Sequence, residues 1–423
     1  MLKLRRATVV ETLQTQEVKP AGRKRRDARD VSAEPEQRLV IALSPEGELA
    51  PEAARREAIA DVRLVGRAEV GDEVIVNTQA LDLGLGSGGF DVVHVNLTRG
   101  LSSDGKLAHP DATHLNVMKL NYTSLQHAVE PVEGRDAGSP LSPLERPAAV
   151  MALHGQLAPL AFAFAQGAPG ARLGYVQTEG GALPGGHSRM VRALREQGLL
   201  AGHITAGTAF GGEAEAMTTA GALRHGLGAL GWDAAVCGPG PGIVGSGTVL
   251  GHGGMVALDS AHVALALGCP TLLVARMSSS DERSRHRGLS HHSLTVLDML
   301  LEPVTVALPA GIRSPVGADL RAGLQSVFGG AMPSGGESVA EGAQQALVLE
   351  VDRVAPERPA RIARHDWRRA RVDLPAYAAS GLSAVTMGRD LAQDPLFFAA
   401  ALAGGSVLAE LSAEAAAASG QEG

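Results

Sequence analysis

Short apolar stretches separated by glycine, proline or aspartate dominate the first 120 residues. Each stretch has the length of a β-strand, and short strands at this spacing are typical of a small, closed or nearly closed antiparallel barrel. A glycine-rich loop at residues 82–90 follows one of them. The predicted strands cover residues 6–13, 39–43, 62–65, 73–77, 92–96 and 116–120.

A charged segment at residues 17–37 interrupts this pattern. It contains two prolines and almost no apolar residues, so it cannot bury enough surface to fold by itself, and we predict a flexible insertion. Its basic run, residues 23–26, could contact an anionic surface. Acidic residues follow directly, which favours a solvated loop.

From about residue 147 the pattern changes, and near-continuous apolar runs alternate with amphipathic segments. Such runs are typical of strands buried on both faces, and their alternation with helices predicts a parallel sheet. The predicted strands are 149–153, 173–177, 203–206, 234–237, 271–275 and 304–308. The predicted helices are 157–166, 188–197, 213–230, 255–267 and 294–301.

The sequence therefore predicts an α/β protein with a wound, mostly parallel sheet and flanking helices, preceded by a small antiparallel β-barrel-like domain. The barrel-like domain is expected at residues 1–129 and a linker rich in Pro, Gly and Ser at 130–146. The wound domain is expected at residues 147–309. An α/β extension with a strand at 346–351, an Ala-rich helix from residue 395 and a C-terminus frayed after about Ala413 is expected at 310–423.

Four polar loops follow predicted strands of the wound domain. They cover residues 178–188, 207–213, 238–254 and 278–292. Ligands of parallel wound sheets bind in the crevice outside the carboxyl ends of the strands. We therefore expect these loops to converge on one ligand-binding edge.

The loop at 238–254 has glycine at 8 of its 17 positions. Glycines let backbone N–H groups approach an anion closely, and a following helix N-terminus favours phosphate or carboxylate. A G-x-G-x-x-G match is weak, because a proline lies inside it and no acidic residue ends the next strand. A tight structural turn is the alternative. The candidate binding residues are Gly240, Gly242, Gly245, Ser246, Gly247 and Thr248.

The segment at 278–292 is rich in arginine and histidine. Arginine forks suit phosphate or carboxylate, and histidine suits proton transfer near neutral pH. The histidines do not have the H-x-x-x-H spacing of a helical zinc site, so we assign no metal. A salt-bridged surface loop is the alternative. The candidates are Arg283, Arg285 and Arg287 for binding and His286, His291 and His292 for catalysis.

Three further residues are candidates. His187 precedes a predicted helix and Glu213 begins another, so both are candidate acids or bases. Arg389 offers one more anion contact. Ser188 could be a nucleophile, but it lacks the G-x-S-x-G elbow and is better explained as a helix N-cap.

Composition excludes several classes of function. The net charge of −7, the pI of about 6 and the 3% of aromatic residues make nucleic-acid binding unlikely. Two cysteines, Cys237 and Cys269, predict neither a disulfide framework nor a zinc site, which fits a reduced, cytoplasmic compartment. We find no signal peptide and no apolar stretch of membrane-spanning length, so we expect no membrane association.

Several segments resemble one bacterial family that is catalogued only as a domain of unknown function and occurs in high-GC bacteria. The similar segments include GDEVIVNTQALDLGLGSGGFDVVHV, MKLNYTSLQ, GYVQTEGGALPGGHSRMVRALREQGLL, GPGPGIVGSGTVLGHGGM, RHRGLSHHSLTVL and TMGRDLAQDPLFF. They span about residues 60–400, and the insertion near residue 25 departs from the family pattern. The resemblance implies no activity and no catalytic residue.

We hypothesise an enzyme that acts on a small anionic substrate, phosphorylated or not, at a cleft formed by the glycine-rich and Arg/His-rich loops. The alternative is a metabolite-sensing or partner-binding regulatory protein without catalysis, and a third option is a structural assembly protein. No cofactor follows from the sequence. A homo-oligomer is compatible with it but not indicated by any pattern.

Overall fold

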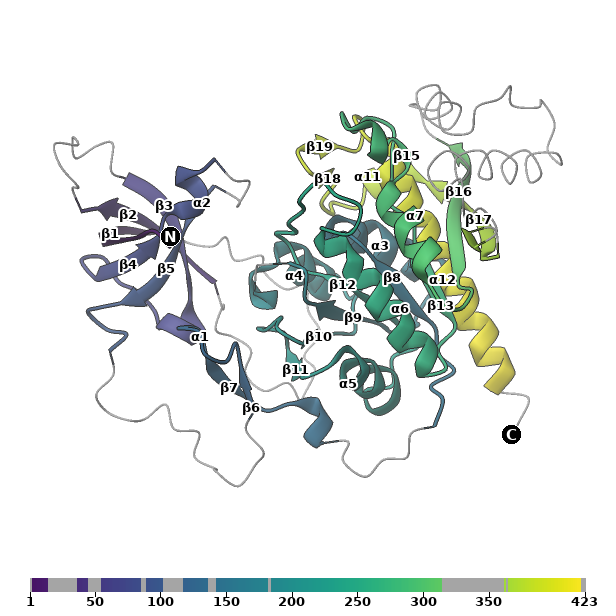
Figure 1. Cartoon of the computed structure of the whole chain (residues 1–423), viewed down its shortest axis with the longest axis horizontal. Helices are drawn as coiled ribbons and strands as arrows, with labels where there is room; N and C mark the ends of the chain where they lie inside the picture. Colours follow the sequence, from purple (N-terminus) through teal and green to yellow (C-terminus); the bar gives the residue numbers. More distant parts are fainter. Residues whose placement is uncertain are drawn as a thin grey trace. The chain divides into compact units, whose positions relative to one another are not determined.

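The computed structural model describes the chain in nine stretches and divides it into two compact units, Met1–Val129 and Glu130–Gly423 (Figure 1). Each unit has its own hydrophobic core. The predicted insertion at 17–37 and the predicted strand at 346–351 lie wholly or mostly outside the described residues. The described stretches are 2–13, 36–44, 55–84, 89–101, 117–135, 142–181, 184–313, 361–362 and 364–419.

The first unit contains a closed five-stranded barrel in the order β1-β2-β3-β5-β4. Alternate residues of β2 point inward, so Leu39, Ile41 and Leu43 are buried. The predicted small barrel is confirmed; its pairings are antiparallel except that of β3 with β5, which is parallel. The strands are β1 (Leu4–Leu13), β2 (Glu36–Leu43), β3 (Arg55–Asp61), β4 (Glu73–Asn77) and β5 (Asp91–Asn96).

Two predictions for the first unit need correction. The apolar run Val62–Val65 is the short helix α1, because the Asp61 side chain accepts a hydrogen bond from the Arg63 N–H and caps it. The strand predicted at 116–120 exists as β6 (Val117–Lys119), but it pairs with β7 (His127–Val129) in a separate hairpin. A second short helix, α2 (Gln79–Asp82), follows β4.

The second unit is built on an eight-stranded sheet in which every pairing is parallel, in the order β11-β10-β9-β12-β8-β13-β16-β17. The first strand, β8, lies in the middle, between β12 and β13. The strands are β8 (Ala148–Met151), β9 (Leu173–Thr178), β10 (Gly202–Ala206), β11 (Ala214–Ala216), β12 (Ala234–Pro239), β13 (Thr271–Val274), β16 (Thr305–Arg313) and β17 (Asp366–Asp373).

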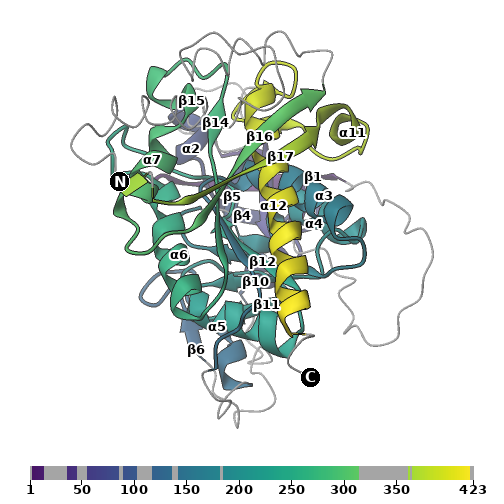
Figure 2. The same ribbon diagram turned by 90° about the vertical axis from the view of Figure 1, so that its right-hand side faces the viewer.

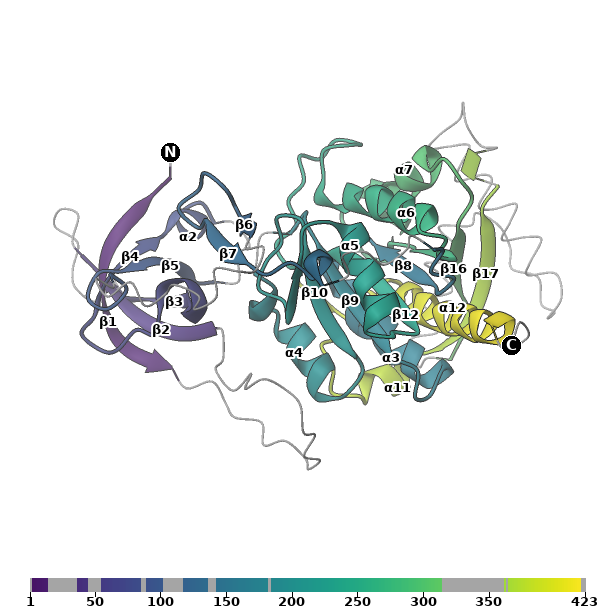
Figure 3. The same cartoon turned by 90° about the horizontal axis from the view of Figure 1, so that it is seen from below.

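Helices cover both faces of this sheet, as predicted. Figures 2 and 3 show α3, α4, α11 and α12 on one face and α5, α6 and α7 on the other. The helix after β8 therefore lies on the opposite face from the helices after β12 and β13. The helices are α3 (Leu157–Gly167), α4 (Arg189–Glu196), α5 (Thr219–Leu223), α6 (Val256–Ala266), α7 (His291–Met299), α11 (Leu374–Ala378) and α12 (Pro395–Ser419).

The single helix predicted at 213–230 is wrong. The segment contains the edge strand β11, then α5, then the π-helical turn η5 (Arg224–Ala229). The Thr218 side chain accepts from the Gly221 N–H and caps α5, so the helix begins at Thr219, six residues later than predicted. Strand β17 was not predicted at all, and α12 continues past Ala413 to Ser419.

Helix α12 is long and apolar enough to cross a membrane by length and composition, so the expectation that the chain holds no such stretch is wrong. It is, however, 83% buried over its apolar window and packs against α3, β16 and β17. A core helix of a folded domain has these same properties. Among the described residues it is the one helix that meets this criterion.

Glycine at three positions of the second unit makes room for Trp232, which is fully buried. A Cβ atom at Gly174 would lie 1.8 Å from the indole, one at Gly226 2.3 Å and one at Gly202 2.8 Å. No side chain fits at such distances, so the abundance of glycine in this sheet partly reflects the packing of one large residue.

Candidate functional site

The loops after β8, β12 and β13 leave the sheet at a topological switch point. Because α3 covers one face while α6 and α7 cover the other, the loop after β8 and the loops after its two neighbours turn apart. In open α/β sheets, ligands bind outside the carboxyl ends of the strands at such a divergence. The glycine-rich loop follows β12, and the Arg/His-rich segment follows β13.

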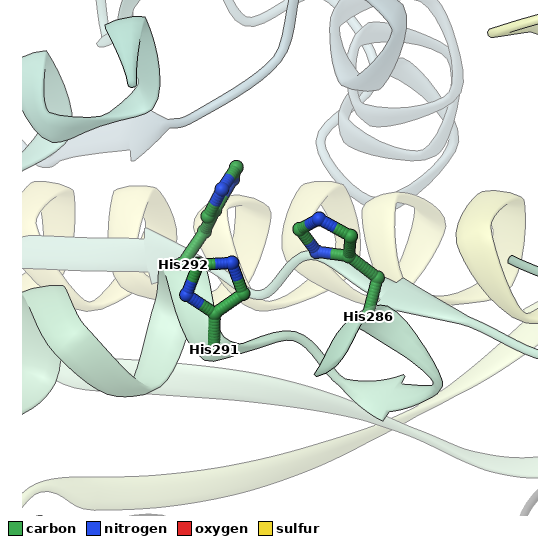
Figure 4. Close-up of side chains that lie close together, drawn as sticks. All are labelled: His286, His291 and His292. Carbon is green, nitrogen blue, oxygen red and sulfur yellow. The ribbon is translucent and has the colours of Figure 1, made fainter. Parts of the chain in front are cut away.

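Four histidines gather at this place. His286 ends the turn η7 (Ser284–His286), His291 and His292 begin α7, and His252 comes from the glycine-rich loop. The rings of His252 and His292 stack, with centroids 3.4 Å apart. His291 lies 4.4 Å from His292 and 4.8 Å from His286 between centroids. Figure 4 shows the three histidines of the Arg/His-rich segment side by side.

All four histidines are buried, with exposed fractions between 1% and 8%. Burial lowers their pKa values below the ordinary histidine value, because the charged form loses its hydration. The guanidinium of Arg276 lowers each of these pKa values further. The imidazoles are therefore neutral at pH 7 and present lone pairs to the site.

Arg276 follows β13 and is 3% exposed. Its Nη1 donates to Nδ1 of His292 at 2.8 Å, and its Nη2 lies 3.4 Å from an oxygen of Asp281. Burial lowers the pKa of Arg276 to about 10, with Asp281 opposing that change, so the side chain keeps its charge at neutral pH. It places a buried positive charge directly beside the imidazoles.

Asp281 organises the arginines around the cluster. Arg283 donates to it at 3.0 Å, Arg389 lies 3.4 Å away, and Arg287 donates to its backbone carbonyl at 2.8 Å. Burial by itself raises the pKa of Asp281, but the hydrogen bonds and charge of Arg283 outweigh it and hold that pKa well below its usual range. The carboxylate is therefore ionised.

Asp394, just before α12, accepts hydrogen bonds from the first residues of the Arg/His-rich segment. It accepts from Ser278 Oγ at 2.6 Å, from the Ser279 N–H at 2.8 Å and from Arg389 Nε at 3.1 Å. Two carboxylates thus stand among three paired arginines (Arg276, Arg283 and Arg389), and the balance of fixed charge is positive.

The glycine-rich loop folds into a hairpin that ends on the histidine cluster. Gly245 and His252 face each other in an antiparallel bridge. Ser246 Oγ donates to the Gly251 carbonyl at 2.9 Å, and Thr248 Oγ1 accepts from the Gly251 N–H at 3.0 Å. The two candidate hydroxyls therefore shape the loop in this structure.

At three of the candidate positions the local structure explains why the residue is glycine. Gly242 and Gly247 have φ of +85° and +79°, which other residues rarely adopt. A Cβ atom at Gly240 would meet the Gln177 amide at 2.4 Å. A Cβ atom at Gly247 would lie 3.6 Å from Arg285, so the loop and the Arg/His-rich segment adjoin. Arg285 is exposed and makes no ion pair with the described residues.

A second polar group lies on the loops after β8 and β9. Ser188 Oγ accepts from the Val191 N–H at 3.2 Å and caps α4, so the interpretation of Ser188 as an N-cap is confirmed. His154 Nε2 lies 2.8 Å from that oxygen, and the Tyr175 hydroxyl lies 3.4 Å from His154 Nδ1. Burial lowers the pKa of His154 to about 4, although a bond to the Pro239 backbone opposes the change.

Two predicted residues lie apart from the histidine cluster. Glu213 stands in the β10–β11 connection and pairs with Arg195 at 2.5 Å, so the prediction that it begins a helix is wrong. His187 is buried at the end of the turn η4 (Gly185–His187), next to the α4 cap, and not in the group that His286, His291 and His292 form.

A family model described as "Protein of unknown function (DUF3866)" matches residues 57–405, from β3 into α12. The chain belongs to this family. The resemblance to a family of unknown function is thereby confirmed, and the membership brings no activity with it. No curated protein and no solved structure matched the chain.

Two polar residues of this DUF3866 member were missed by the sequence analysis. Arg276 directly follows the apolar run 271–275, and a charged residue at the carboxyl end of a predicted buried strand could have been recognised as a candidate site residue. Asp394 precedes Pro395 at the start of a helix, a pattern typical of an N-terminus, but its 116-residue separation from Ser278 hides the contact. His252 was noted only as a member of the glycine-rich loop.

Proposed function

We propose that this DUF3866 protein is an enzyme that acts on a small anionic substrate, a phosphate ester or a carboxylate, at the carboxyl edge of β8, β12 and β13. One observation carries the proposal: His252 of the glycine-rich loop stacks on His292 of the Arg/His-rich segment, so the two segments with anion-binding chemistry meet. An anion there would find an excess of guanidinium charge and backbone N–H groups.

The neutral histidines are the candidates for the proton-transfer step. A general base must be unprotonated at working pH and close to the substrate. His286 and His291 meet the first condition, and they adjoin Arg285, which is exposed and so accessible to a ligand. In this proposal Arg285 binds the anionic group, and one of the two imidazoles transfers the proton.

A regulatory, partner-binding protein is the second candidate, and one observation favours it. Three apolar side chains of the glycine-rich loop are exposed: Val244 by 72%, Val249 by 60% and Leu250 by 59%. Exposed apolar residues grouped in one loop are typical of interaction sites. In that case the anion would be a signal and not a substrate.

A thermal-shift screen tests the anion site. We expect sugar phosphates, nucleotides or small carboxylates to raise the melting temperature, since a ligand at about 100 times its Kd adds roughly 2.7 kcal/mol of stability. The Arg285→Ala variant should weaken the best ligand about tenfold or more, because a charge-assisted hydrogen bond contributes roughly 1.5–3 kcal/mol.

The matched control is Arg371→Ala, an exposed arginine on the edge strand β17. It should bind as the parent does. Equal binding by all three proteins, or no shift from any anion, would remove the proposed site.

Four expectations from the sequence stay predictions alongside this proposal. They are a cytoplasmic location, an origin in high-GC bacteria, no membrane or nucleic-acid partner, and a homo-oligomeric state that composition leaves open.

A further inference from the structure

Three histidines within seven residues of the chain present their nitrogens to one another. One ring nitrogen each of His286, His291 and His292 lies within 4.8 Å of the other two (Figure 4). The exposed fractions are 1%, 8% and 8%, so all three residues are buried. Anion binding by arginine does not require a buried group of three imidazoles at this spacing.

Hydrogen bonds within the described residues satisfy some ring nitrogens of these histidines but not all of them. Ser290 Oγ lies 2.8 Å from Nδ1 of His286. This contact fixes the orientation of the His286 ring, so its Nε2 points away from Ser290. Nε2 of His291 is buried and has no hydrogen-bond partner among the described residues. A buried polar nitrogen without a partner destabilises the fold, so this atom points to a ligand.

We infer that His286, His291 and His292 bind one divalent transition-metal ion, zinc or its close analogues cobalt and nickel. Neutral imidazoles are the ligands that these ions prefer, and three protein ligands leave a fourth position for water or substrate. The Ser290 hydroxyl is the outer partner that commonly orients a metal-binding histidine. Where the proposed function also holds, His286 and His291 would serve as metal ligands, and a water molecule in the fourth position would take over the proton transfer beside the anion bound by Arg285.

Ligation requires a small closure of the three rings. Nitrogens bound to zinc at about 2.0–2.1 Å in a tetrahedron are roughly 3.3 Å apart, which is shorter than the 4.8 Å limit within which they lie here. His286 stands on a short turn and its two partners on the first turn of α7, so the closure would come from their side chains and from the short segment between η7 and α7.

Arg276 opposes metal binding at this site. It donates to Nδ1 of His292, which places the proton of that neutral ring on Nε2. Ligation by Nε2 needs the other tautomer, so the guanidinium must turn away, and Asp281, 3.4 Å from it, is the partner that remains. The positive charge of Arg276 also weakens cation binding, and a bound anion would offset it.

Cobalt binding to the untagged full-length chain tests the inference. After chelator treatment and dialysis we expect one Co²⁺ per chain, with the intense visible absorption of a four-coordinate ion. The His291→Ala variant should bind at least about 100-fold more weakly, because a ligand is lost where even outer partners contribute 10- to 100-fold. Zinc should displace the cobalt and remove the absorption.

The matched control is His94→Ala, a half-buried histidine on β5 of the barrel, which should titrate as the parent does. If His291→Ala fails to fold, the parent alone decides: less than about a tenth of an equivalent of bound cobalt overturns the inference. Binding that survives in a folded His291→Ala variant also overturns it.

The two proposals fail separately. An anion-induced thermal shift without cobalt binding refutes the metal site and leaves the anion site standing. Cobalt binding without any anion effect supports the metal site and refutes the proposed substrate class.

Discussion

At His292 two neighbours impose the same protonation state. The Arg276 N–H donates to its Nδ1, and the His252 ring stacks on its face at 3.4 Å. A protonated ring would carry a hydrogen on Nδ1, where it could no longer accept from Arg276, and it would stand beside the positive charge of that same guanidinium. Electrostatic repulsion and burial therefore act in the same direction, and both keep this histidine neutral across the physiological range.

His154 gives a prediction for the pH dependence of stability. Its pKa in the folded protein is about 4, below the value of about 6.5 of an unfolded histidine. The unfolded chain therefore takes up a proton first, and stability should fall as pH drops from about 6.5 to 4, by up to roughly 3 kcal/mol from this one group. Above pH 6.5 it adds no pH dependence.

Denaturant unfolding at pH 7, 6 and 5 checks this prediction. A His154→Asn variant loses a titrating group but keeps a polar side chain, so its stability should decline less steeply than that of the parent over this range. An unchanged slope would mean that His154 does not titrate as its surroundings imply.

At the scale of elements, buried strands were the most predictable feature. The runs that form β8, β9, β10, β12 and β13 are rich in apolar residues and buried on both faces, and glycine or proline separates them from the helices. The run at 62–65 has three apolar residues around Arg63, and so short a run cannot by itself distinguish a strand from a capped helical turn.

The site was predictable in part, for a related reason. The carboxyl-end rule placed the glycine-rich loop and the Arg/His-rich segment at one edge without knowledge of the sheet order. The stacking of His252 on His292 and the contact of Asp394 with Ser278 depend on tertiary packing between distant positions, which no local pattern records. Glu213 was misplaced because a three-residue edge strand resembles the start of an amphipathic helix.

Gly174 carries a prediction at this same scale. A Cβ atom there would lie 1.8 Å from the Trp232 ring, so Gly174→Ala must displace either the indole or β9. We expect a loss of at least about 2 kcal/mol in the free energy of unfolding, at the upper part of the range for overpacked cores.

Urea unfolding followed by tryptophan fluorescence measures this effect, since both tryptophans, Trp232 and Trp367, belong to the second unit. The control is Gly134→Ala, where a Cβ atom meets nothing within 4 Å. A loss no larger than that of the control would mean that the indole has room to move.

At the scale of the molecule, the chain separates a small barrel from a wound sheet, each with its own core. The chemistry described above lies entirely in the second unit, on loops held by strands that are buried on both faces. Such a division places adaptable polar loops on a rigid scaffold, as in other wound α/β proteins. The family match begins in β3, so it covers β4 and β5 of the barrel and most of the second unit, while β1 and β2 lie outside it.

The central claim is that the carboxyl edge of this sheet transforms a small anion. The direct measurement is proton and phosphorus NMR of the anions that raise the melting temperature, incubated with the parent protein and with Arg285→Ala. Our account predicts new product signals with the parent, and a rate at least about tenfold lower with the variant, because the anion contact is lost. A ligand that binds tightly to the parent yet stays chemically unchanged would contradict the enzyme proposal and identify the protein as a sensor.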